Sequence, residues 1–399
     1  MEQGKNARFG NIKEKNLKTL FNMIAEHAGI SRAQLAREAG LSKPAVSAMV
    51  DELISRGYVK MAGEGKSDQA GRKPICLKLN AQKGQFLTIA LSSRSAACRV
   101  YDFALRQVEA FDLPIVYQKG CMQTLLENIR RASGKWQEDQ TVALCITLPA
   151  ATNADLSEIR STVLDLPGDL NLLEETCALS LPGAKVLANE TIAYVYAEQK
   201  FSCPEKENLI FVEVAEGVGA GIMIENRVFR GVSGSAGEFG HMSIDRNGKN
   251  CCCGRKGCLE LAVSKPAILQ RAVQAGVIKN GDGYAGIAAA LAAGSDAAQT
   301  CMRGVAQDLA FGLGNMIAMF DIGDIVLGGG VEELGEAFLQ MLRKETDRLL
   351  ISGNYRTKNH LSIHYAALGE DAKNLGAAKY FCDHILMMTE EVSGKICFI

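Results

Sequence analysis

The stretch HMSIDRNGKNCCCGRKGCLE, residues 241–260, places one histidine and four cysteines within twenty positions. Clustered cysteines in a long chain indicate a metal site, whereas scattered ones are usually buried thiols. Three of these cysteines, Cys251, Cys252 and Cys253, are consecutive, and three neighbouring residues cannot all bind one ion comfortably. The stretch therefore predicts a metal site in which one thiol is spare.

The composition is typical of a soluble globular protein with two or three domains. The chain has 399 residues, of which 47% are hydrophobic and 22% are charged. No run approaches about eighteen consecutive apolar residues, and the first residues, MEQGKNARFG, lack the apolar stretch of a signal peptide. We therefore expect a cytoplasmic protein without a membrane-spanning segment.

Charge is distributed unevenly along the chain. Residues 1–80 hold 14 Lys and Arg against 8 Asp and Glu, a balance of +6, whereas the remainder holds 30 against 37, a balance of −7. A basic module joined to an acidic body is typical of a nucleic-acid-binding domain attached to a sensing domain. Chance variation of the surface could give the same balance, so charge alone does not decide the function.

The N-terminal part of the chain carries the pattern of three short helices followed by two strands. Apolar residues at helical spacing fill NLKTLFNMIAEHAG (16–29), and Ser31 and Ser42 are suited to cap the next two helices. The segment YVKMAGEGKSDQAGRKPICLKLN (58–80) then predicts two strands around a polar loop. This order predicts a winged helix-turn-helix domain over residues 1–80.

A winged helix-turn-helix would contact DNA through its third helix and its wing. The N-terminal end of that helix enters the major groove, and the wing reaches phosphates or the minor groove. The predicted DNA-binding residues are Ser42, Lys43, Ala45 and Ser47 in the helix and Lys66, Arg72 and Lys73 in the wing. A three-helix packing domain that does not bind DNA is the alternative interpretation of this pattern.

From residue 85 onward, short apolar runs that predict strands alternate with longer runs that predict helices. The first half comprises the predicted strands QFLTIAL (85–91), ACRVYDF (97–103) and VEAFDLPI (108–115), a helix near 122–136 and the strand TVALCITL (141–148). After a helical region at 189–199, the second half comprises NLIFVEVA (208–215), a long helix at about 296–320, DIVLG (324–328), a helix from Glu332 and HLSIHYAAL (360–368). Two halves of comparable build predict a duplicated α/β architecture with a cleft between them.

A glycine-rich turn and a group of polar residues are candidates for that cleft. In VAEGVGAGIMI (214–224), glycines at 217, 219 and 221 are expected to let the backbone approach a ligand closely. Glu238 and His241 follow at a spacing of three, and Glu260 closes the cysteine stretch. Two carboxylates and an imidazole near such a turn could bind the vicinal hydroxyls of a polyhydroxylated ligand. Each acid taken alone is more simply a solvated surface charge, but their grouping favours a site.

Together these motifs resemble the ROK family, which groups sugar-responsive repressors with sugar kinases. The resemblance covers nearly the whole chain and is carried by AGRKP (70–74), VLANETIAYVYAE (186–198), EGVGAGI (216–222), SAGEFGHMSI (235–244), CCCGRKGCLE (251–260) and IVLGGGV (325–331). It implies an actin-like, ribonuclease-H-like duplicated α/β fold of the ATPase and sugar-kinase type, with a central cleft, over residues 81–399. The sugar contacts of the family fall here on Asn189, Glu190, Glu238, His241 and Glu260.

The resemblance also assigns the metal ligands. The family pattern of His, nine residues, Cys-x-Cys, four residues and Cys falls on His241, Cys251, Cys253 and Cys258, a set suited to tetrahedral Zn²⁺. Four protein ligands leave no open position, so the implied zinc is structural. Cys252 is then the spare thiol, and its neighbours are expected to point the other way. The second imidazole nitrogen of His241 would remain available for a sugar hydroxyl.

A kinase of this family would need an Asp-x-Gly-Gly-Thr turn after its first strand, to cradle ATP and serve its metal. The matching positions carry Ala90 for the acid, Ser92 and Ser93 for the glycines, and Arg94 for Thr. At the family's catalytic-base position stands Glu190, whose extra methylene moves the carboxylate on the order of 1 Å. Phosphoryl transfer is therefore expected to be lost, while hydroxyl recognition is retained.

The sequence thus predicts a sugar-responsive transcriptional repressor rather than an enzyme. Its expected partners are double-stranded operator DNA, a sugar or sugar-phosphate effector, and further copies of itself in a homodimer or homotetramer. Two other hypotheses stay open. One is an ATP-dependent, glucokinase-like sugar kinase with an added DNA-binding domain, and the other is an interaction protein that regulates by binding a transport component.

Overall fold

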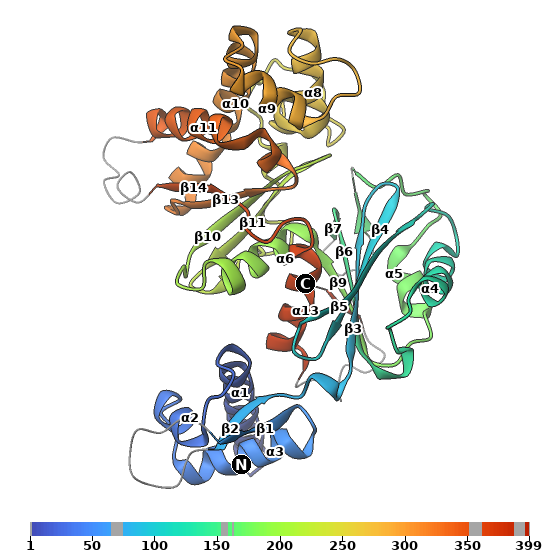
Figure 1. The fold of residues 1–399 in the computed structure, drawn as a ribbon, viewed down its shortest axis with the longest axis vertical. Helices are drawn as coiled ribbons and strands as arrows, with labels where there is room; N and C mark the ends of the chain where they lie inside the picture. Colours follow the sequence, from blue (N-terminus) through green and yellow to red (C-terminus); the bar gives the residue numbers. More distant parts are fainter. Residues whose placement is uncertain are drawn as a thin grey trace.

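The computed structural model describes residues 2–64, 75–152, 159–161, 163–350, 361–386 and 396–398. Figure 1 shows a small helical module at the lower end of the molecule and two α/β lobes above it. None of the helices in these ranges is long and apolar enough to cross a membrane.

The lower module has the predicted winged helix-turn-helix order. Its elements are α1 (Glu2–Glu26), α2 (Arg32–Glu38), α3 (Lys43–Ser55), β1 (Val59–Glu64) and β2 (Ile75–Leu79). Ser31 caps α2 through a capping box with Gln34, and the Ser42 hydroxyl accepts a hydrogen bond from the Ala45 N–H to cap α3. The antiparallel pair β1–β2 forms the wing. Both predicted N-caps are confirmed. The sequence could predict them because capping depends on residues that are close in sequence.

Lobe 1 contains a six-stranded sheet in the order β15–β9–β6–β3–β4–β5. The strands are β3 (Gln85–Leu91), β4 (Ser95–Asp102), β5 (Gln107–Pro114), β6 (Thr141–Leu148), β9 (Ala184–Asn189) and β15 (Ile396–Phe398). A two-stranded ribbon, β7 (Ala151–Thr152) with β8 (Ile159–Arg160), follows β6. The helices α4 (Cys121–Ala132) and α5 (Leu172–Ala178) cover one face of the large sheet, and α13 (Ala372–His384) covers the other.

Lobe 2 repeats this plan in a five-stranded sheet, β12–β11–β10–β13–β14. The strands are β10 (Leu209–Val214), β11 (Val218–Ile224), β12 (Arg227–Val228), β13 (Asp324–Gly328) and β14 (Ser362–Tyr365). In both lobes the first strand lies inside the sheet, with two antiparallel strands on one side and parallel strands on the other. The predicted duplication, which is the actin-like arrangement, is confirmed.

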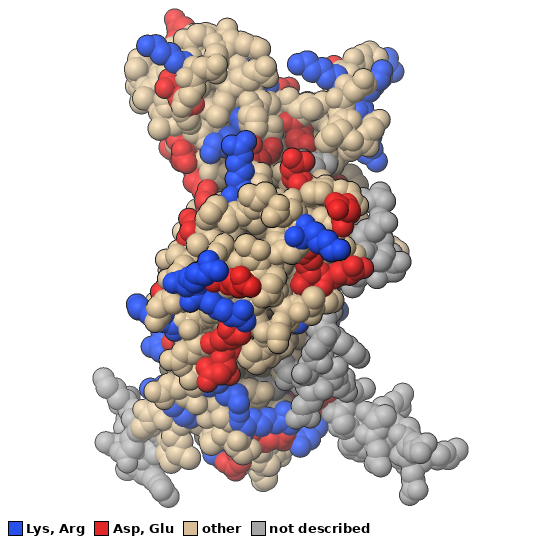
Figure 2. All heavy atoms as spheres, turned by 90° about the vertical axis from the view of Figure 1, so that its right-hand side faces the viewer, with Lys and Arg blue, Asp and Glu red and all other residues tan. Residues whose placement is uncertain are grey.

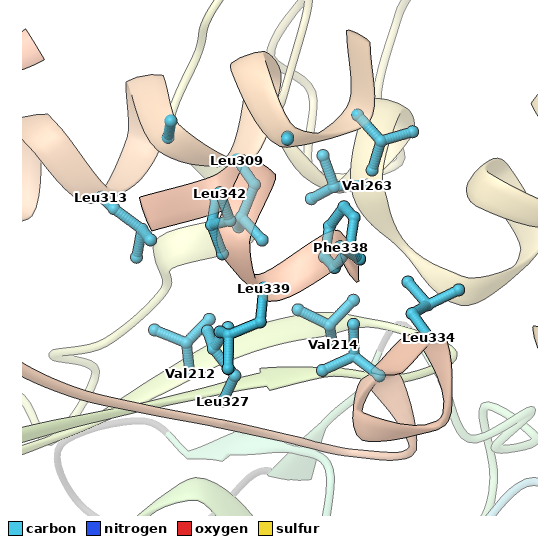
Figure 3. Packing of buried hydrophobic residues seen from close by; sticks show 14 of the residues in the cluster. Val212, Val214, Val263, Leu309, Leu313, Leu327, Leu334, Phe338, Leu339 and Leu342 are labelled. Atoms are coloured by element: carbon cyan, nitrogen blue, oxygen red, sulfur yellow. The ribbon is translucent and has the colours of Figure 1, made fainter. Parts of the chain in front are cut away.

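Helices of lobe 2 bury the sheet on its outer side. They are α7 (Glu260–Val263), α8 (Lys265–Gln274), α9 (Tyr284–Ala292), α10 (Asp296–Phe320) and α11 (Gly335–Leu349). Leu309 and Leu313 of α10 and Phe338 and Leu342 of α11 meet Val212 of β10 in one apolar cluster (Figure 3). The helix expected from Glu332 begins instead as a 3₁₀ turn, and α11 starts at a glycine with φ of +76°.

The winged module is packed against lobe 1 through aromatic side chains. Phe21 of α1 and Tyr58 lie 6.2 and 5.6 Å from the ring of Phe103, which in turn stacks on Phe86 of β3. At the same junction, Lys18 Nζ of α1 donates a hydrogen bond of 3.0 Å to the carbonyl oxygen of His384, the last residue of α13. The module and lobe 1 therefore share one hydrophobic cluster.

Candidate functional site

A cavity of about 300 Å³ lies where strand ends of the two lobes face each other. Its walls come from the end of β3, the β9–α6 junction, the β10–β11 turn and the segment before the cysteine stretch, where α6 is Glu190–Ala197. The five residues predicted to contact a sugar all line it: Asn189, Glu190, Glu238, His241 and Glu260. The topology thus brings together residues from both halves of the sequence.

Asn189 ends β9 and caps α6. Its Oδ1 accepts hydrogen bonds from Thr191 N and Oγ1 and from Ile192 N, and its Nδ2 donates to the carbonyl of Ala150 at 3.0 Å. An amide nitrogen has two N–H groups, so one donor remains for a ligand. Asn189 therefore fixes the start of α6, and one N–H of its side-chain amide remains to donate a hydrogen bond to a ligand.

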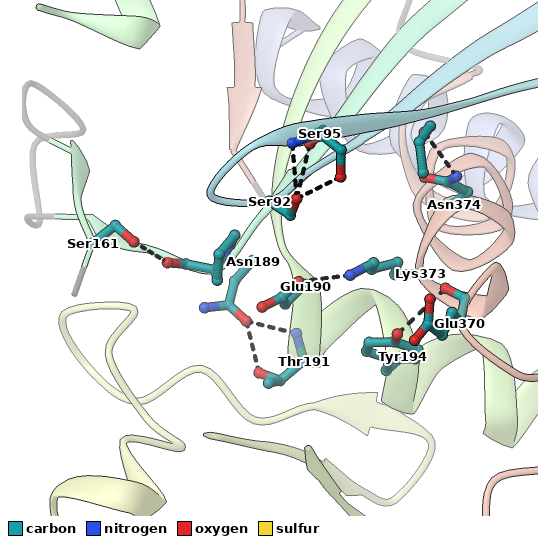
Figure 4. A network of polar contacts seen from close by, with 12 residues as sticks. Ser92, Ser95, Ser161, Asn189, Glu190, Thr191, Tyr194, Glu370, Lys373 and Asn374 are labelled. Atoms are coloured by element: carbon teal, nitrogen blue, oxygen red, sulfur yellow. Dashed lines mark hydrogen bonds and ion pairs between the residues drawn. The ribbon is translucent and has the colours of Figure 1, made fainter. Parts of the chain in front are cut away.

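Glu190 starts α6 and forms a buried ion pair with Lys373, which is distant in sequence (Figure 4). Its Oε2 lies 3.0 Å from Nζ of Lys373, in the first turn of α13, and the side chains are only 9% and 18% exposed. Burial, followed by the negative charge of Glu190, raises the pKa of Glu213 well above its usual range. Burial alone would lower the pKa of the Lys373 ammonium group. The negative charges of its neighbours, above all Glu190, outweigh burial and raise that pKa.

The glycine-rich turn lies at the pocket as predicted and also has a role in packing. A side chain at Gly221 would lie 2.1 Å from the carbonyl oxygen of Thr191, and one at Gly219 would meet the Thr191 methyl group at 2.9 Å. Gly221 therefore admits α6 against β11, whereas Gly219 both contacts α6 and lines the pocket. Gly217 borders the pocket, where a side chain would lie 3.1 Å from Glu260 Oε2. That same carboxylate oxygen accepts a hydrogen bond from Val218 N at 2.9 Å, so Glu260 holds the turn in place.

The histidine and three of the cysteines converge as the ligand pattern implied. The ligand atoms of His241, Cys251, Cys253 and Cys258 all lie within 4.8 Å of one another. Two of the separations are 3.6 Å, between Cys253 Sγ and Cys258 Sγ, and 3.7 Å, between Cys251 Sγ and His241 Nδ1. A tetrahedral Zn²⁺ with bonds of about 2.3 Å to sulfur has edges of about 3.8 Å, so the four residues fit such an ion.

His241 faces two sites at once. Its Nδ1 points to the cysteines, whereas its Nε2 lies 3.9 Å from Oε2 of Glu238, on the pocket side. A ring whose Nδ1 is bound to metal carries its proton on Nε2, which can then donate to a ligand.

Cys252 does not point away from its neighbours, contrary to the prediction. Its Sγ lies 3.9 Å from Cys251 Sγ, and both sulfurs are within 4.8 Å of a carboxylate oxygen of Glu260. The short loop closes after Cys253 at Gly254, which has φ of +86°, so consecutive side chains do not alternate as they would in a strand. Cys252 nevertheless lies outside the set of four.

The turn that would cradle phosphates in a kinase is closed on itself. Ser92 Oγ lies 2.7 Å from Ser95 Oγ and accepts a hydrogen bond from Ser95 N, while Tyr117 donates to the Ser92 carbonyl. Ala90, at the position of the metal-binding acid, is 3% exposed in the sheet.

The predicted DNA-binding residues of α3 differ in availability. Ser42 and Lys43 are exposed, and Ala45 and Ser47 are partly buried. Arg32 of α2 donates hydrogen bonds to the hydroxyl and the carbonyl of Ser47, so this serine first serves to join α2 to α3. The wing residues Lys66, Arg72 and Lys73 lie outside the described residues. Figure 2 shows basic and acidic side chains interspersed over the face that it presents.

Sequence reasoning missed the residues that complete the pocket. Lys373, Glu213, Glu216 and Ser161 also line the cavity. Lys373 lies 183 positions after Glu190 and belongs to no local motif, and Glu213 occupies a strand that otherwise consists of apolar residues. An acid inside a buried strand was the available signal for Glu213, because such a group needs a partner.

Fold and site together define a winged helix-turn-helix protein built on the actin-like sugar-kinase scaffold. Residues 107–384 match the ROK family, and residues 14–60 match a winged helix-turn-helix DNA-binding domain. The chain belongs to the ROK family.

Related proteins match most of the chain. The chain is 27% identical to the xylose repressor of Bacillus subtilis over 390 residues, which cover 94% of this chain and 97% of that protein. It is 27% identical over 282 residues to the DNA-binding transcriptional dual regulator NagC of Escherichia coli, with 68% of each chain covered.

Two solved structures have the same fold. A ROK family transcriptional regulator, homologous to the Escherichia coli MLC protein, matches with a TM-score of 0.76 over 95% of this chain and 98% of its own, at 22% identity. A ROK family glucokinase from Streptomyces griseus, in complex with glucose and AMPPNP, matches with a TM-score of 0.64 over 74% of this chain and 98% of its own, at 26% identity.

Proposed function

We propose that the chain is a sugar-responsive, DNA-binding transcriptional repressor that has lost kinase activity and acts in the cytoplasm. One observation carries the proposal: a winged module is packed onto lobe 1 of a fold whose cleft keeps the family's sugar contacts but lacks its phosphate-handling groups. The similarity to a xylose repressor along 94% of the chain supports the same function. Residues 1–80 would bind DNA and residues 81–399 would bind the effector.

The loss of kinase activity follows from the chemistry of three positions. The buried methyl group of Ala90 cannot hold a metal ion for ATP. Hydrogen bonds between Ser92 and Ser95 already use groups that would otherwise face phosphate oxygens. Glu190 Oε2 is engaged by Lys373 at 3.0 Å, so this carboxylate oxygen serves an ion pair within the protein where a catalytic base would face the sugar hydroxyl.

Sugar recognition would use the remaining polar groups of the pocket. Glu238 offers carboxylate oxygens to hydroxyl protons, and His241 Nε2 and the free N–H of Asn189 offer donors to hydroxyl oxygens. Glu260 would contact the sugar and would also fix the glycine-rich turn, because its carboxylate accepts the hydrogen bond from Val218 N. Because binding sites of about 300 Å³ are at the small end of ligand pockets, a single sugar ring is the expected size.

The cysteine cluster would hold a structural Zn²⁺ through His241, Cys251, Cys253 and Cys258. Such an ion ties the loop that carries Glu260 to the segment that carries Glu238, and it fixes the tautomer of His241. With all four positions taken by protein ligands, the ion would stabilise the site rather than take part in chemistry.

A homodimer or homotetramer would place two winged modules on one operator. Exposed apolar side chains on lobe 2 support such assembly. Phe311 and Met319 of α10 are 44% and 74% exposed, and Leu349, at the end of α11, is 46% exposed and lies beside Gly314 of α10. Exposed apolar side chains that gather on one surface mark contact sites.

Helix α13 offers a physical route from the sugar to the DNA. Its first turn carries Lys373, which pairs with Glu190 in the pocket, and its last residue, His384, accepts the hydrogen bond from Lys18 on α1. A sugar that binds one arrangement of this helix more tightly than another would shift the position of the winged module.

The test combines DNA binding with an assay for turnover. DNA fragments are selected from a random pool by the full-length protein, and the affinity for a labelled fragment is measured with each of a panel of sugars. We expect one sugar to change the Kd by about five- to 150-fold, and no ADP release with ATP and hexose. A Lys18→Met variant should bind that sugar unchanged but respond less on DNA. Turnover that Glu190→Gln abolishes, or a Kd that no sugar alters, would refute the proposal.

A further inference from the structure

The charge of the pocket restricts the class of effector that it can bind. Five glutamates line the cavity of about 300 Å³: Glu190, Glu213, Glu216, Glu238 and Glu260. Among the described residues that line it, Lys373 is the one lysine, and there is no arginine. Proteins that bind phosphorylated ligands use Arg, Lys or backbone N–H groups at helix N-termini to neutralise the phosphate.

The single lysine is not available to a phosphate. Its Nζ is 3.0 Å from Glu190 Oε2, and its side chain is 18% exposed. Removing Lys373 from Glu190 to serve a ligand would leave that buried carboxylate beside Glu213 without a counter-charge, which is costly. The ammonium group therefore balances the protein's own acids.

Three backbone N–H groups at the pocket are likewise engaged. The Asn189 side chain accepts from the N–H groups of Thr191 and Ile192 at the start of α6, where an anion would otherwise bind. Glu260 accepts from Val218 N in the glycine-rich turn. Glu216, in the same turn, is exposed and places a further acidic side chain at the pocket wall.

We propose that the effector is an unphosphorylated monosaccharide, neutral or bearing an amino group, and that the acidic lining excludes sugar phosphates. Carboxylates accept hydrogen bonds from hydroxyl or ammonium protons, whereas a phosphate with a charge of about −1.5 to −2 near pH 7 is repelled by them. This inference rests on the proposed sugar-sensing function and names the class of ligand for the same pocket.

The test compares matched pairs of ligands by calorimetry on the full-length protein. Xylose, glucose, mannose, N-acetylglucosamine and glucosamine are titrated, each hexose beside its 6-phosphate, with inorganic phosphate as an anion control. We expect at least one free sugar to bind, and its 6-phosphate, where it has one, to bind at least about tenfold more weakly. A Glu216→Lys variant, changed at an exposed position that should leave the melting temperature unaltered, should reduce that ratio. The matched control is Glu174→Lys on the exposed face of α5, which should leave the ratio unchanged.

The outcomes separate this inference from the function on which it rests. A sugar phosphate that binds as tightly as the free sugar, or more tightly, would overturn the inference and leave sugar sensing intact. A ratio that stays unchanged in Glu216→Lys would likewise overturn the inference alone. If no ligand of either series binds, the sugar-sensing proposal itself fails and this inference fails with it.

Discussion

Replacement of Lys373 by Met is the perturbation that most sharply tests the buried network at the pocket. At 3.0 Å and an effective dielectric constant of about 20, the attraction between Nζ and Glu190 Oε2 is about 5 to 6 kcal/mol before desolvation is counted. Removing one partner of a buried pair typically costs about 3–5 kcal/mol, because the other charge stays buried without compensation. We therefore expect Lys373→Met to lower the free energy of unfolding by about 3–5 kcal/mol near pH 7.

The variant should also acquire a characteristic pH dependence. Without the ammonium group, Glu190 and Glu213 are two adjacent buried carboxyls, and the folded state must hold protons that the unfolded state releases. Bound protons favour the folded state as pH falls. Glu213 already has a raised pKa in wild type, so only the one further proton that the Glu190–Glu213 pair holds in the variant changes the difference, and the loss in Lys373→Met should shrink toward pH 4.5 by up to about 1.4 kcal/mol per pH unit.

Urea unfolding followed by circular dichroism measures both effects, and a surface ion pair provides the control. Arg130 and Glu138 are 36% and 35% exposed, so Arg130→Met should cost only about 0.2–1 kcal/mol. The double variant Glu190→Gln, Lys373→Met should be more stable than the sum of its single changes by about 2 kcal/mol. If Lys373→Met costs no more than Arg130→Met, or if the two changes are additive, the reasoning about this network is refuted.

Three further predictions concern other parts of the chain. Cys258→Ser should lose its bound zinc, from about one ion per chain to nearly none, and should unfold at a lower temperature. Cys252→Ser should keep its metal. Equal metal content in the two variants, measured by atomic emission, would contradict the ligand set. Glu213→Gln should stabilise the protein increasingly as pH rises above about 4.5, by at most about 1.4 kcal/mol per pH unit. The reason is that the raised pKa of Glu213 makes wild type lose stability as pH rises through the folded-state pKa. Parallel plots of unfolding free energy against pH for wild type and variant would show that the carboxyl is not held protonated. Lys43→Ala should weaken binding to all DNA sequences alike and reduce the slope of log Kd against log salt concentration by about 0.9. Fluorescence anisotropy at several salt concentrations measures this slope. An unchanged slope would mean that Lys43 makes no phosphate contact.

Local sequence was sufficient for features that depend on near neighbours. Ser31 and Ser42 cap α2 and α3 as expected, because an N-cap needs only the backbone two or three residues ahead. The duplicated order of strands also followed from short apolar runs. Among the cleft residues, Glu238 and His241 are three positions apart, so their closeness in space could be predicted without knowledge of distant contacts.

Features that depend on distant contacts could not be inferred in this way. Gly221 was expected to let the backbone approach a ligand, but its neighbour is Thr191, which reaches it only after α6 has packed on β11. Lys373 pairs with Glu190 across 183 positions and has no motif of its own. Cys252 was expected to point away from its neighbours, and the loop that closes at Gly254 turns it back toward Cys251.

The most direct test of sugar sensing is the affinity of the sugar measured twice, by calorimetry, on the full-length protein with and without its selected DNA fragment. Coupling between two binding sites is reciprocal, so the factor by which the sugar changes the Kd for DNA must equal the factor by which DNA changes the Kd for the sugar. We predict the same factor, between about five and 150, in both experiments. A sugar Kd that is equal in the presence and absence of DNA would contradict the account, because the pocket and the winged module would then be independent.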